Sequence, residues 1–415
     1  MAANVGFAPM VSRAENEQAP SRDRLRTVIL VSLDGTRPVD FSPETMPWLE
    51  AESHRGLRAE KLIPVVPTNT FPNHVSLVTG VAPERHGIVN NSFIDPSRGR
   101  FRKRDIPSWI EVEPIWSLLA RQGVPSASYH WVGSEGRWPS GGAPVHWEPF
   151  DSKIRAKAKV DRILEWLDLD DPCRRPQLIT TWFHGADHAG HVEGPGSKRG
   201  ARDLRAQDRA LQRLWQGLVE RGLADSTLLV VVSDHGMAAP ERRIDAGAAL
   251  RKAGIKASVL GIGGFASVYL DDPATGPRAL SVLRETGLEA YFREAAPASL
   301  PVSHPRFGDL VVTAPGDAAI VYRRLSLAGY HGYPPTGPDM AAIFVVVGAG
   351  VPRGVRVPEV RAIDVAPTLL SLFGASIPPW IDGSPVAALG PLYAEATPAS
   401  KFAKLAGCRN KSLLQ

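Results

Sequence analysis

The segment Pro67–His74 (PTNTFPNH) places the hydroxyl of Thr70 where a helix is expected to begin. Pro72 suits a first helical turn, because its missing N–H would have no partner there in any case, and Gly80 is expected to end the helix. The free N–H groups and the positive dipole end of a helix start favour a phosphoryl group. Thr70 is therefore a candidate nucleophile. The plain alternative is that it only caps the helix.

Carboxylates and imidazoles follow three apolar segments that are expected to be buried strands, at residues 26–33, 177–183 and 227–233. A sixth residue of the same kind lies far along the chain between a tyrosine and a glycine. Functional groups of an open α/β sheet gather at the carboxyl ends of its strands, so we expect these side chains to converge near Thr70. The set comprises Asp34, Asp187, His191, Asp234, His235 and His331.

Aspartate and histidine together form the mixed oxygen and nitrogen ligand set that zinc accepts, with manganese less favoured. Asp187 and His191 are four residues apart, which places them on one face if the segment is helical. Each residue alone has an ordinary reading as a cap, a turn former or a core side chain. Jointly they predict a dinuclear site. Such a site would also explain a threonine nucleophile, since a bound dication lowers the pKa of an attached hydroxyl.

The elements that position these residues alternate between apolar strands and amphipathic helices, which predicts an α/β fold with a mostly parallel sheet covered on both faces. Helices are expected near residues 46–55, 113–122, 154–167, 200–222 and 364–373, and loops at 83–91 and 134–151. Between about residues 255 and 322 the pattern changes to short strands around one helix. This region is predicted to be a smaller α+β lobe inserted into a single catalytic domain spanning residues 26–395.

Composition supports a globular chain of 415 residues, of which 43% are hydrophobic and 22% charged. A net charge of +5 leans toward anionic ligands but is too diffuse to indicate a nucleic-acid polymer. No run reaches the roughly 20 apolar residues of a membrane helix. Residues 1–25 are predicted to be a disordered or processed tail, and residues 396–415 a C-terminal tail. The pairing of Cys173 with Cys408 and the oligomeric state are left open.

The motifs resemble those of the nucleotide pyrophosphatase/phosphodiesterase family in the alkaline phosphatase superfamily. The segment TFPNH at residues 70–74 is the most specific, and DHAGHVEGP at 187–195 and SDHGM at 233–237 follow in the expected order. The resemblance implies an alkaline phosphatase-like fold and two Zn²⁺ ions, with Mn²⁺ as a second choice. It also implies that Asn91 donates its amide to a phosphate oxygen, and that relatives are commonly exported, although no signal peptide is visible here. By that resemblance one ion would take Asp34, Thr70, Asp234 and His235, and the other Asp187, His191 and His331.

The chain departs from the family pattern at Asn69, where lysine is frequent, and at residues 185–186, where Glu-Pro is common. No arginine follows Thr70 closely to clamp a dianionic monoester, which favours diesters. Phe71 and Trp131 are predicted to form an apolar slot for a base or leaving group, and the alternative is that both are core aromatics.

The resulting hypothesis is hydrolysis of phosphodiester or pyrophosphate bonds in nucleotides or similar small diesters, through a phosphothreonine. The alternatives are a phosphonate or phosphomonoester hydrolase using the same site, a phosphomutase, and a non-catalytic binding protein with the same fold.

Overall fold

The computed structural model describes residues 27–139, 141–322, 327–396 and 398. The predicted N-terminal tail, nearly all of the predicted C-terminal tail, and Cys408 lie outside the described residues. The extent of the catalytic domain and of its tails therefore stays a prediction. None of the described helices is both long and apolar enough to cross a membrane.

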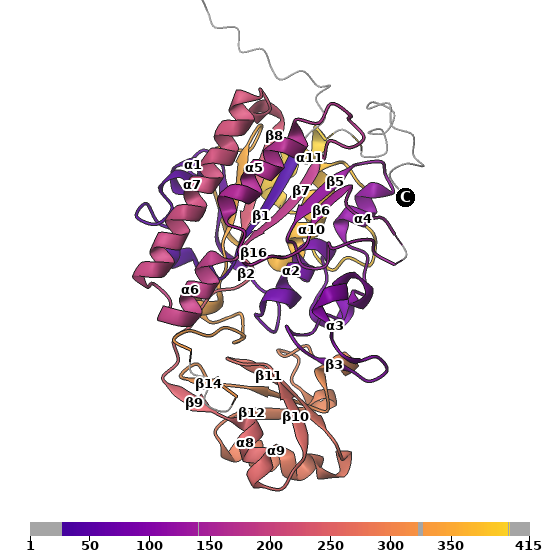
Figure 1. Cartoon of the computed structure of the whole chain (residues 1–415), viewed down its shortest axis with the longest axis vertical. Helices are drawn as coiled ribbons and strands as arrows, with labels where there is room; N and C mark the ends of the chain where they lie inside the picture. The colour runs from indigo at the N-terminus through magenta and orange to yellow at the C-terminus, as the bar shows by residue number, and fades with distance from the viewer. Residues whose placement is uncertain (1–26, 140, 323–326, 397, 399–415) are drawn as a thin grey trace, which may run out of the picture.

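An eight-stranded sheet with the order β16-β2-β15-β8-β1-β7-β5-β6 forms the centre of the molecule (Figure 1). Strand β1 pairs in parallel with both β7 and β8, which confirms the mostly parallel sheet. Its strands are β1 (Thr27–Leu33), β2 (Leu57–Ile63), β5 (Ser126–Tyr129), β6 (His146–Glu148), β7 (Leu178–Phe183), β8 (Thr227–Val232), β15 (Phe344–Gly348) and β16 (Val355–Arg361).

Both faces of this sheet are covered, because successive β1 side chains enter two different hydrophobic clusters. Val28 and Leu30 pack on one side, whereas Ile29, Val31 and Leu33 pack on the other. Burial on both faces explains why β1 is an unbroken apolar run. The first cluster receives side chains of α2 (Thr70–Thr79), α4 (Ile115–Ala120), α10 (Val365–Leu372) and α11 (Gly390–Ala394). The second receives those of α1 (Pro47–Ser53), α5 (Ala156–Leu167) and α7 (Lys198–Glu220).

A smaller lobe lies below the carboxyl edge of the sheet and has its own core (Figure 1). Its antiparallel sheet has the order β10-β11-β13-β12. The lobe elements are β9 (Arg242–Ile244), α8 (Ala246–Lys252), β10 (Ala257–Leu260), β11 (Phe265–Leu270), α9 (Gly276–Glu285), β12 (Glu289–Phe292), β13 (Leu310–Thr313) and β14 (Ala318–Ile320). The chain leaves β8 at this edge and returns from the lobe to the same edge, so β15 runs antiparallel to β8.

Three local predictions from the sequence are wrong. The segment predicted as a loop at 83–91 contains α3 (Pro83–His86), and the one at 134–151 contains the edge strand β6. Both elements are short, and β6 carries the half-exposed Trp147, so neither has a clear apolar period. The lobe core also includes Ile244 and Leu250, which precede the predicted boundary at 255.

Helix α2 ends at Gly80, whose φ of +72° lies in the left-handed region, as expected for a helix-terminating glycine. A Cβ on Gly80 would lie 2.7 Å from Cγ2 of Ile381. We therefore expect Gly80→Ala to lower the free energy of unfolding by about 2 kcal/mol, combining backbone strain with overpacking. Urea denaturation measures this change.

Gly254 provides the matched control. It follows α8 with a φ of +71°, and a Cβ added there would meet only open space. Gly254→Ala should therefore lower the free energy of unfolding by about 1 kcal/mol, through backbone strain alone. If both variants lost the same free energy of unfolding, the side chain of Ile381 would have moved aside without measurable cost.

Candidate active site

The predicted aspartates and histidines all lie at the carboxyl edge of the central sheet. Asp34 directly follows β1, and Asp234 and His235 come two and three residues after β8 ends. Asp187 and His191 lie on α6 (Gly185–Glu193), which begins two residues after β7. His331 comes from the segment between the lobe and β15. The structure thus brings together the six residues that sequence spacing singled out, in two groups of three.

The first group comprises Asp34, Asp234 and His235, whose candidate ligand atoms lie within 4.8 Å of one another. Nε2 of His235 is 3.5 Å from Oδ1 of Asp34 and 3.2 Å from Oδ2 of Asp234. Their second carboxylate oxygens are held in place. Oδ2 of Asp34 accepts a hydrogen bond from Nε1 of Trp182 at 2.9 Å, and Oδ1 of Asp234 accepts one from the N–H of Gly35 at 3.2 Å.

The second group comprises Asp187, His191 and His331. Oδ1 of Asp187 is 3.4 Å from Nε2 of His191 and 3.9 Å from Nε2 of His331. The two groups adjoin, because the rings of His235 and His331 stack with their centroids 3.9 Å apart. A Cβ on Gly35, which follows Asp34, would contact Asp187 at 3.1 Å, so only a small residue lets the two groups approach this closely.

Each of the three imidazoles is oriented by a carbonyl oxygen at its Nδ1. The acceptors are Gly329 O for His191 at 2.9 Å, Thr68 O for His331 at 3.0 Å, and Gly236 O for His235 at 2.9 Å. A carbonyl oxygen only accepts, so Nδ1 carries the hydrogen in each ring. Nε2 then turns toward the carboxylates, in the arrangement typical of metal-ligating histidines.

The carboxylate oxygens nearest these Nε2 atoms lack hydrogen bonds. Oδ1 of Asp34, Oδ1 of Asp187 and Oδ2 of Asp234 are buried and accept none from the described residues. Burial raises the pKa of Asp34 well above its ordinary value, and the negative charges of Asp234 and Asp187 raise it further. Burial and the neighbouring histidines lower the pKa of His331 well below its usual range. Buried, crowded carboxylates beside imidazole nitrogens fit divalent cations.

Thr70 is the first residue of α2 and faces the first group. Its Oγ1 lies 3.2 Å from Nε2 of His235. Asn69, not Thr70, occupies the N-cap position, so the alternative in which Thr70 is a cap is wrong. Asn73 holds the preceding turn, because its Oδ1 accepts from the N–H of Val65 at 2.7 Å and its Nδ2 donates to Pro67 O at 3.1 Å. The hydroxyl is thereby fixed at the start of a buried helix.

Asn91 and Asn90 have different environments in the structure, so their roles can be told apart although they are adjacent in the sequence. Oδ1 of Asn91 accepts from the N–H of Phe71 at 2.8 Å, so its Nδ2 is the atom turned outward as a donor. Asn90 is buried, and its Oδ1 accepts from Nδ2 of Asn69 at 2.8 Å and from the N–H of Asn91 at 2.7 Å. Asn90 therefore supports the turn that presents Asn91 beside Thr70.

Comparison with known proteins assigns the family. The sequence matches the family described as type I phosphodiesterase / nucleotide pyrophosphatase over residues 28–334. The chain belongs to this phosphodiesterase family. The match contains Thr70, Asn91 and both groups of aspartates and histidines.

Individual relatives agree with this assignment. A Schizosaccharomyces pombe protein named as an uncharacterized pyrophosphatase/phosphodiesterase is 37% identical over 219 residues, which cover 51% of this chain and 45% of the relative. Venom phosphodiesterase from Macrovipera lebetinus is 34% identical over 227 residues, which cover 53% of this chain and 26% of the venom protein. The chain thus spans less than half the length of these curated relatives.

A solved structure covers nearly all of the described fold. Human ectonucleotide pyrophosphatase/phosphodiesterase 5 superposes with a TM-score of 0.81 at 25% identity, covering 88% of this chain and 99% of the human chain. Its murine counterpart, as an inactive threonine-to-alanine variant in complex with AMP, superposes with a TM-score of 0.80 at 25% identity. The match covers 86% of this chain and 97% of the murine chain. The alkaline phosphatase-like architecture predicted from the sequence is confirmed.

The aromatic slot predicted from the sequence is wrong at Trp131. Its side chain is fully buried, its Nε1 donates to His74 O at 3.1 Å, and its ring lies 5.0 Å from that of His74. Trp131 is therefore a core residue. Phe71 is partly exposed and contacts Phe101 edge to face at 6.2 Å, so its role in binding stays a prediction.

Several supporting residues were missed by the sequence reasoning. Asn69 orients a predicted ligand, since its Oδ1 accepts from Nδ1 of His331 at 2.8 Å. His74 lies behind Thr70, with Nδ1 2.9 Å from Thr70 O and 3.4 Å from Oδ2 of Asp234. Lys103 places its ammonium 4.7 Å from the ring centre of Phe71. His74 lies inside the TFPNH segment and Asn69 directly precedes it, so both could have been suspected, whereas Trp182 and Lys103 carry no comparable signal.

Proposed function

We propose that this chain hydrolyses phosphodiester or pyrophosphate bonds of nucleotides or similar small diesters through a phosphothreonine at Thr70. The observation that carries the proposal is the position of Thr70 Oγ1, 3.2 Å from His235 in a buried group of metal-ligand residues. A buried hydroxyl at a helix start, surrounded by this many carboxylates and imidazoles, is best explained as a nucleophile.

Two Zn²⁺ ions, with Mn²⁺ less favoured, match the mixed oxygen and nitrogen donors. We assign Asp34, Thr70, Asp234 and His235 to one ion, and Asp187, His191 and His331 to the other. When bound, such ions lower the pKa of a hydroxyl and offset negative charge on phosphate oxygens.

The chain's own residues then account for positioning and for bond exchange. Oγ1 of Thr70 forms a bond to phosphorus as the bond to the leaving-group oxygen breaks; the threonine proton goes to solvent and the leaving oxygen takes up a proton. Nδ2 of Asn91, whose Oδ1 accepts from the N–H of Phe71, is placed to donate to a non-bridging oxygen. Water then cleaves the phosphothreonine at phosphorus and restores the hydroxyl.

The solved relative supports a nucleotide ligand. The murine protein is described as an inactive threonine-to-alanine variant in complex with AMP, which agrees with both a nucleotide substrate and a threonine nucleophile here. The complete set of predicted ligands argues against a non-catalytic binding protein. Phosphonate or phosphomonoester hydrolysis by the same residues is the second candidate.

A comparison of two chromogenic substrates tests the proposal. We expect kcat/KM for thymidine 5′-p-nitrophenyl phosphate to exceed that for p-nitrophenyl phosphate by about tenfold or more, because no arginine closely follows Thr70 in the sequence to clamp a dianion. Release of nitrophenolate under steady-state conditions gives both values. A preference for the monoester would overturn the diester assignment in favour of the second candidate.

A further inference from the structure

The side chain of Lys159 is completely buried inside the protein. This residue lies on α5 and has no exposed surface, although lysine is rarely buried unless a partner binds its amine. Its Nζ donates a hydrogen bond to the carbonyl oxygen of Trp182 on β7. Burial lowers the pKa of Lys159 to about 7, and the negative charge of Asp34 opposes this shift. The amine thus lies within electrostatic reach of a predicted metal ligand while belonging to neither group of three.

The carbonyl of Trp182 needs a donor because the sheet ladder ends beside it. Phe183 O accepts from the N–H of Asp34 at 3.0 Å on the β1 side. Because successive carbonyls of a strand point to opposite sides, the carbonyl of Trp182 points toward β5. Strand β5 ends directly before His130, whose φ of +67° turns the chain away. The amine of Lys159 therefore supplies the hydrogen bond that a longer β5 would have supplied.

The end of β7 that Lys159 holds supports both groups of predicted ligands. The indole Nε1 of Trp182 donates to Oδ2 of Asp34 at 2.9 Å. The indole also contacts the rings of His74 and Phe150, at centroid distances of 5.0 and 4.7 Å. Helix α6, which carries Asp187, begins two residues after β7 ends. The position of the β7 end therefore determines where the Asp34 carboxylate and the start of α6 lie.

The plain alternative is that Lys159 only satisfies a carbonyl that would otherwise be buried without a partner. The identity of the bonded residue favours more than this. Lys159 binds the same residue whose side chain orients Asp34. Residues that orient metal ligands control metal affinity nearly as strongly as the ligands themselves. A change at Lys159 should therefore be felt at the first group and not only in the stability of the fold.

We propose that Lys159 is a positioning residue for the first group. By holding the carbonyl of Trp182, it fixes the indole that directs the Asp34 carboxylate toward the bound ion. This inference rests on the proposed function, because it requires that the first group holds a metal ion. It adds a residue outside the ligand set on which metal occupancy depends.

Lys159→Met tests the proposal, because methionine fills a similar volume and removes the donor. We expect the affinity for one of the two zinc ions to fall about tenfold, the effect typical of losing a residue that orients a metal ligand. Competition with a chelator measures this affinity. In the cobalt-substituted protein, the visible absorption bands should also change, since they depend on the ligand geometry around the ion.

Trp182→Phe tests the second link of the same route, because it removes the indole N–H and keeps an aromatic ring. We expect it to lower the zinc affinity about tenfold as well. If Lys159 acts through Trp182, the double variant should bind zinc about as well as the weaker of the two single variants. Losses that multiply in the double variant would overturn the route through Trp182.

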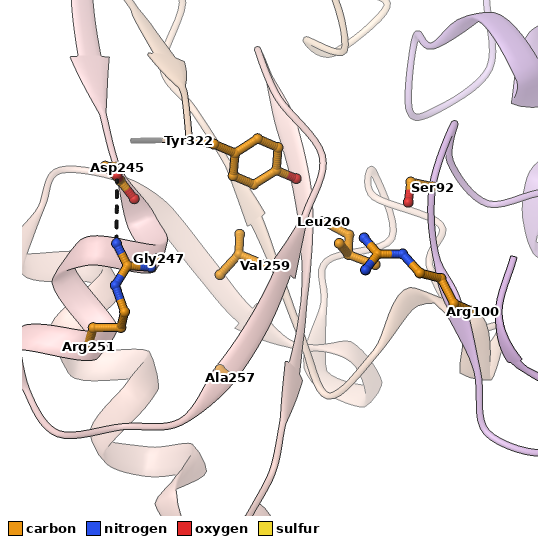
Figure 2. A pocket seen from close by; sticks show the side chains of 9 residues that line it. All are labelled: Ser92, Arg100, Asp245, Gly247, Arg251, Ala257, Val259, Leu260 and Tyr322. Atoms are coloured by element: carbon orange, nitrogen blue, oxygen red, sulfur yellow. Dashed lines mark ion pairs between the residues drawn. The ribbon is translucent and has the colours of Figure 1, made fainter. Parts of the chain in front are cut away.

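Two control variants remove a cation elsewhere. Lys157 lies on the same helix two residues earlier, is exposed, and pairs with Asp161 at 2.9 Å. Arg251 lies in the lobe, where Figure 2 shows it beside Asp245 at a cavity of about 390 Å³. None of the residues lining this cavity is a predicted metal ligand. Lys157→Met and Arg251→Met should therefore leave the zinc affinity and the cobalt spectrum unchanged.

The outcomes separate the inference from the proposed function. Lys159→Met with unchanged zinc affinity and an unchanged cobalt spectrum would show that Lys159 serves the fold alone, and would overturn the inference. Lys159→Gln replaces it if Lys159→Met does not fold. Its side chain is one atom shorter and does not reach the carbonyl of Trp182 without a shift, so unchanged zinc affinity there would overturn the inference too. Failure of the unmodified chain to bind zinc would instead overturn the proposed function.

Discussion

Thr70→Ala is expected to lower kcat for a nucleotide diester by about four orders of magnitude, because it removes the hydroxyl on which the proposed covalent intermediate forms. Thr70 Oγ1 lies 3.2 Å from Nε2 of His235, and the next hydroxyl along the helix, that of Ser76, instead lies 3.0 Å from Nε2 of His86. Steady-state kinetics measures kcat. Elemental analysis of the same sample should find nearly unchanged metal content, because Asp34, Asp234 and His235 remain in place.

Thr70→Ser separates loss of the hydroxyl from loss of the side chain's packing. Serine keeps the oxygen and fits the buried helix start, so its kcat should stay within about tenfold of the unmodified enzyme. A Thr70→Ala variant that turned over at the original rate would refute the nucleophile assignment. A variant that lost its metal along with its activity would instead show that Thr70 acts mainly as a ligand.

The sequence predicted the central fold because its signals are strong where burial is two-sided. Strands β1 and β8 are continuous apolar runs, since their side chains enter hydrophobic clusters on both faces of the sheet. Weak elements were missed. The edge strand β6 has only three residues, all at least partly exposed, and the lobe elements β9 and α8 are short and charged. Such segments gain their structure from tertiary contacts that no local pattern reveals.

The convergence of the five candidate ligands that come after β1, β7 and β8 followed from one topological rule, namely that parallel strands end at a common edge. His331 lies between the lobe and β15, so this rule did not place it. The residues that orient these candidate ligands could not be predicted from the same rule. Trp182 looks like any buried strand residue until the fold brings its Nε1 to 2.9 Å from Oδ2 of Asp34. Trp131 illustrates the opposite error, since an aromatic residue near the site in the chain is fully buried behind His74. Side-chain direction at strand ends and in turns depends on packing across elements, which spacing alone does not encode.

Asp234→Asn is the substitution expected to remove metal as well as activity. Oδ2 of Asp234 is buried, lacks a hydrogen bond and faces Nε2 of His235 at 3.2 Å. An amide there lacks the negative charge and turns either a weaker oxygen or an N–H toward the cation. We expect about one equivalent less zinc per chain after dialysis and an activity loss of about a thousandfold. Elemental analysis and initial rates at saturating zinc measure the two effects.

Asp208→Asn isolates the metal effect from the cost of altering a buried carboxylate. Asp208 is also buried, but its oxygens accept from the N–H groups of Trp48 and Leu49 at 3.0 and 2.9 Å, joining α7 to α1. Its amide variant should lose stability by about 1 to 2 kcal/mol while keeping its zinc, because only a backbone-capping contact changes. Loss of zinc in both variants would mean that the metal content reports general destabilisation. Loss in Asp234→Asn alone would tie the zinc to the unpaired oxygen beside His235, and unchanged zinc in Asp234→Asn would remove that residue from the ligand set.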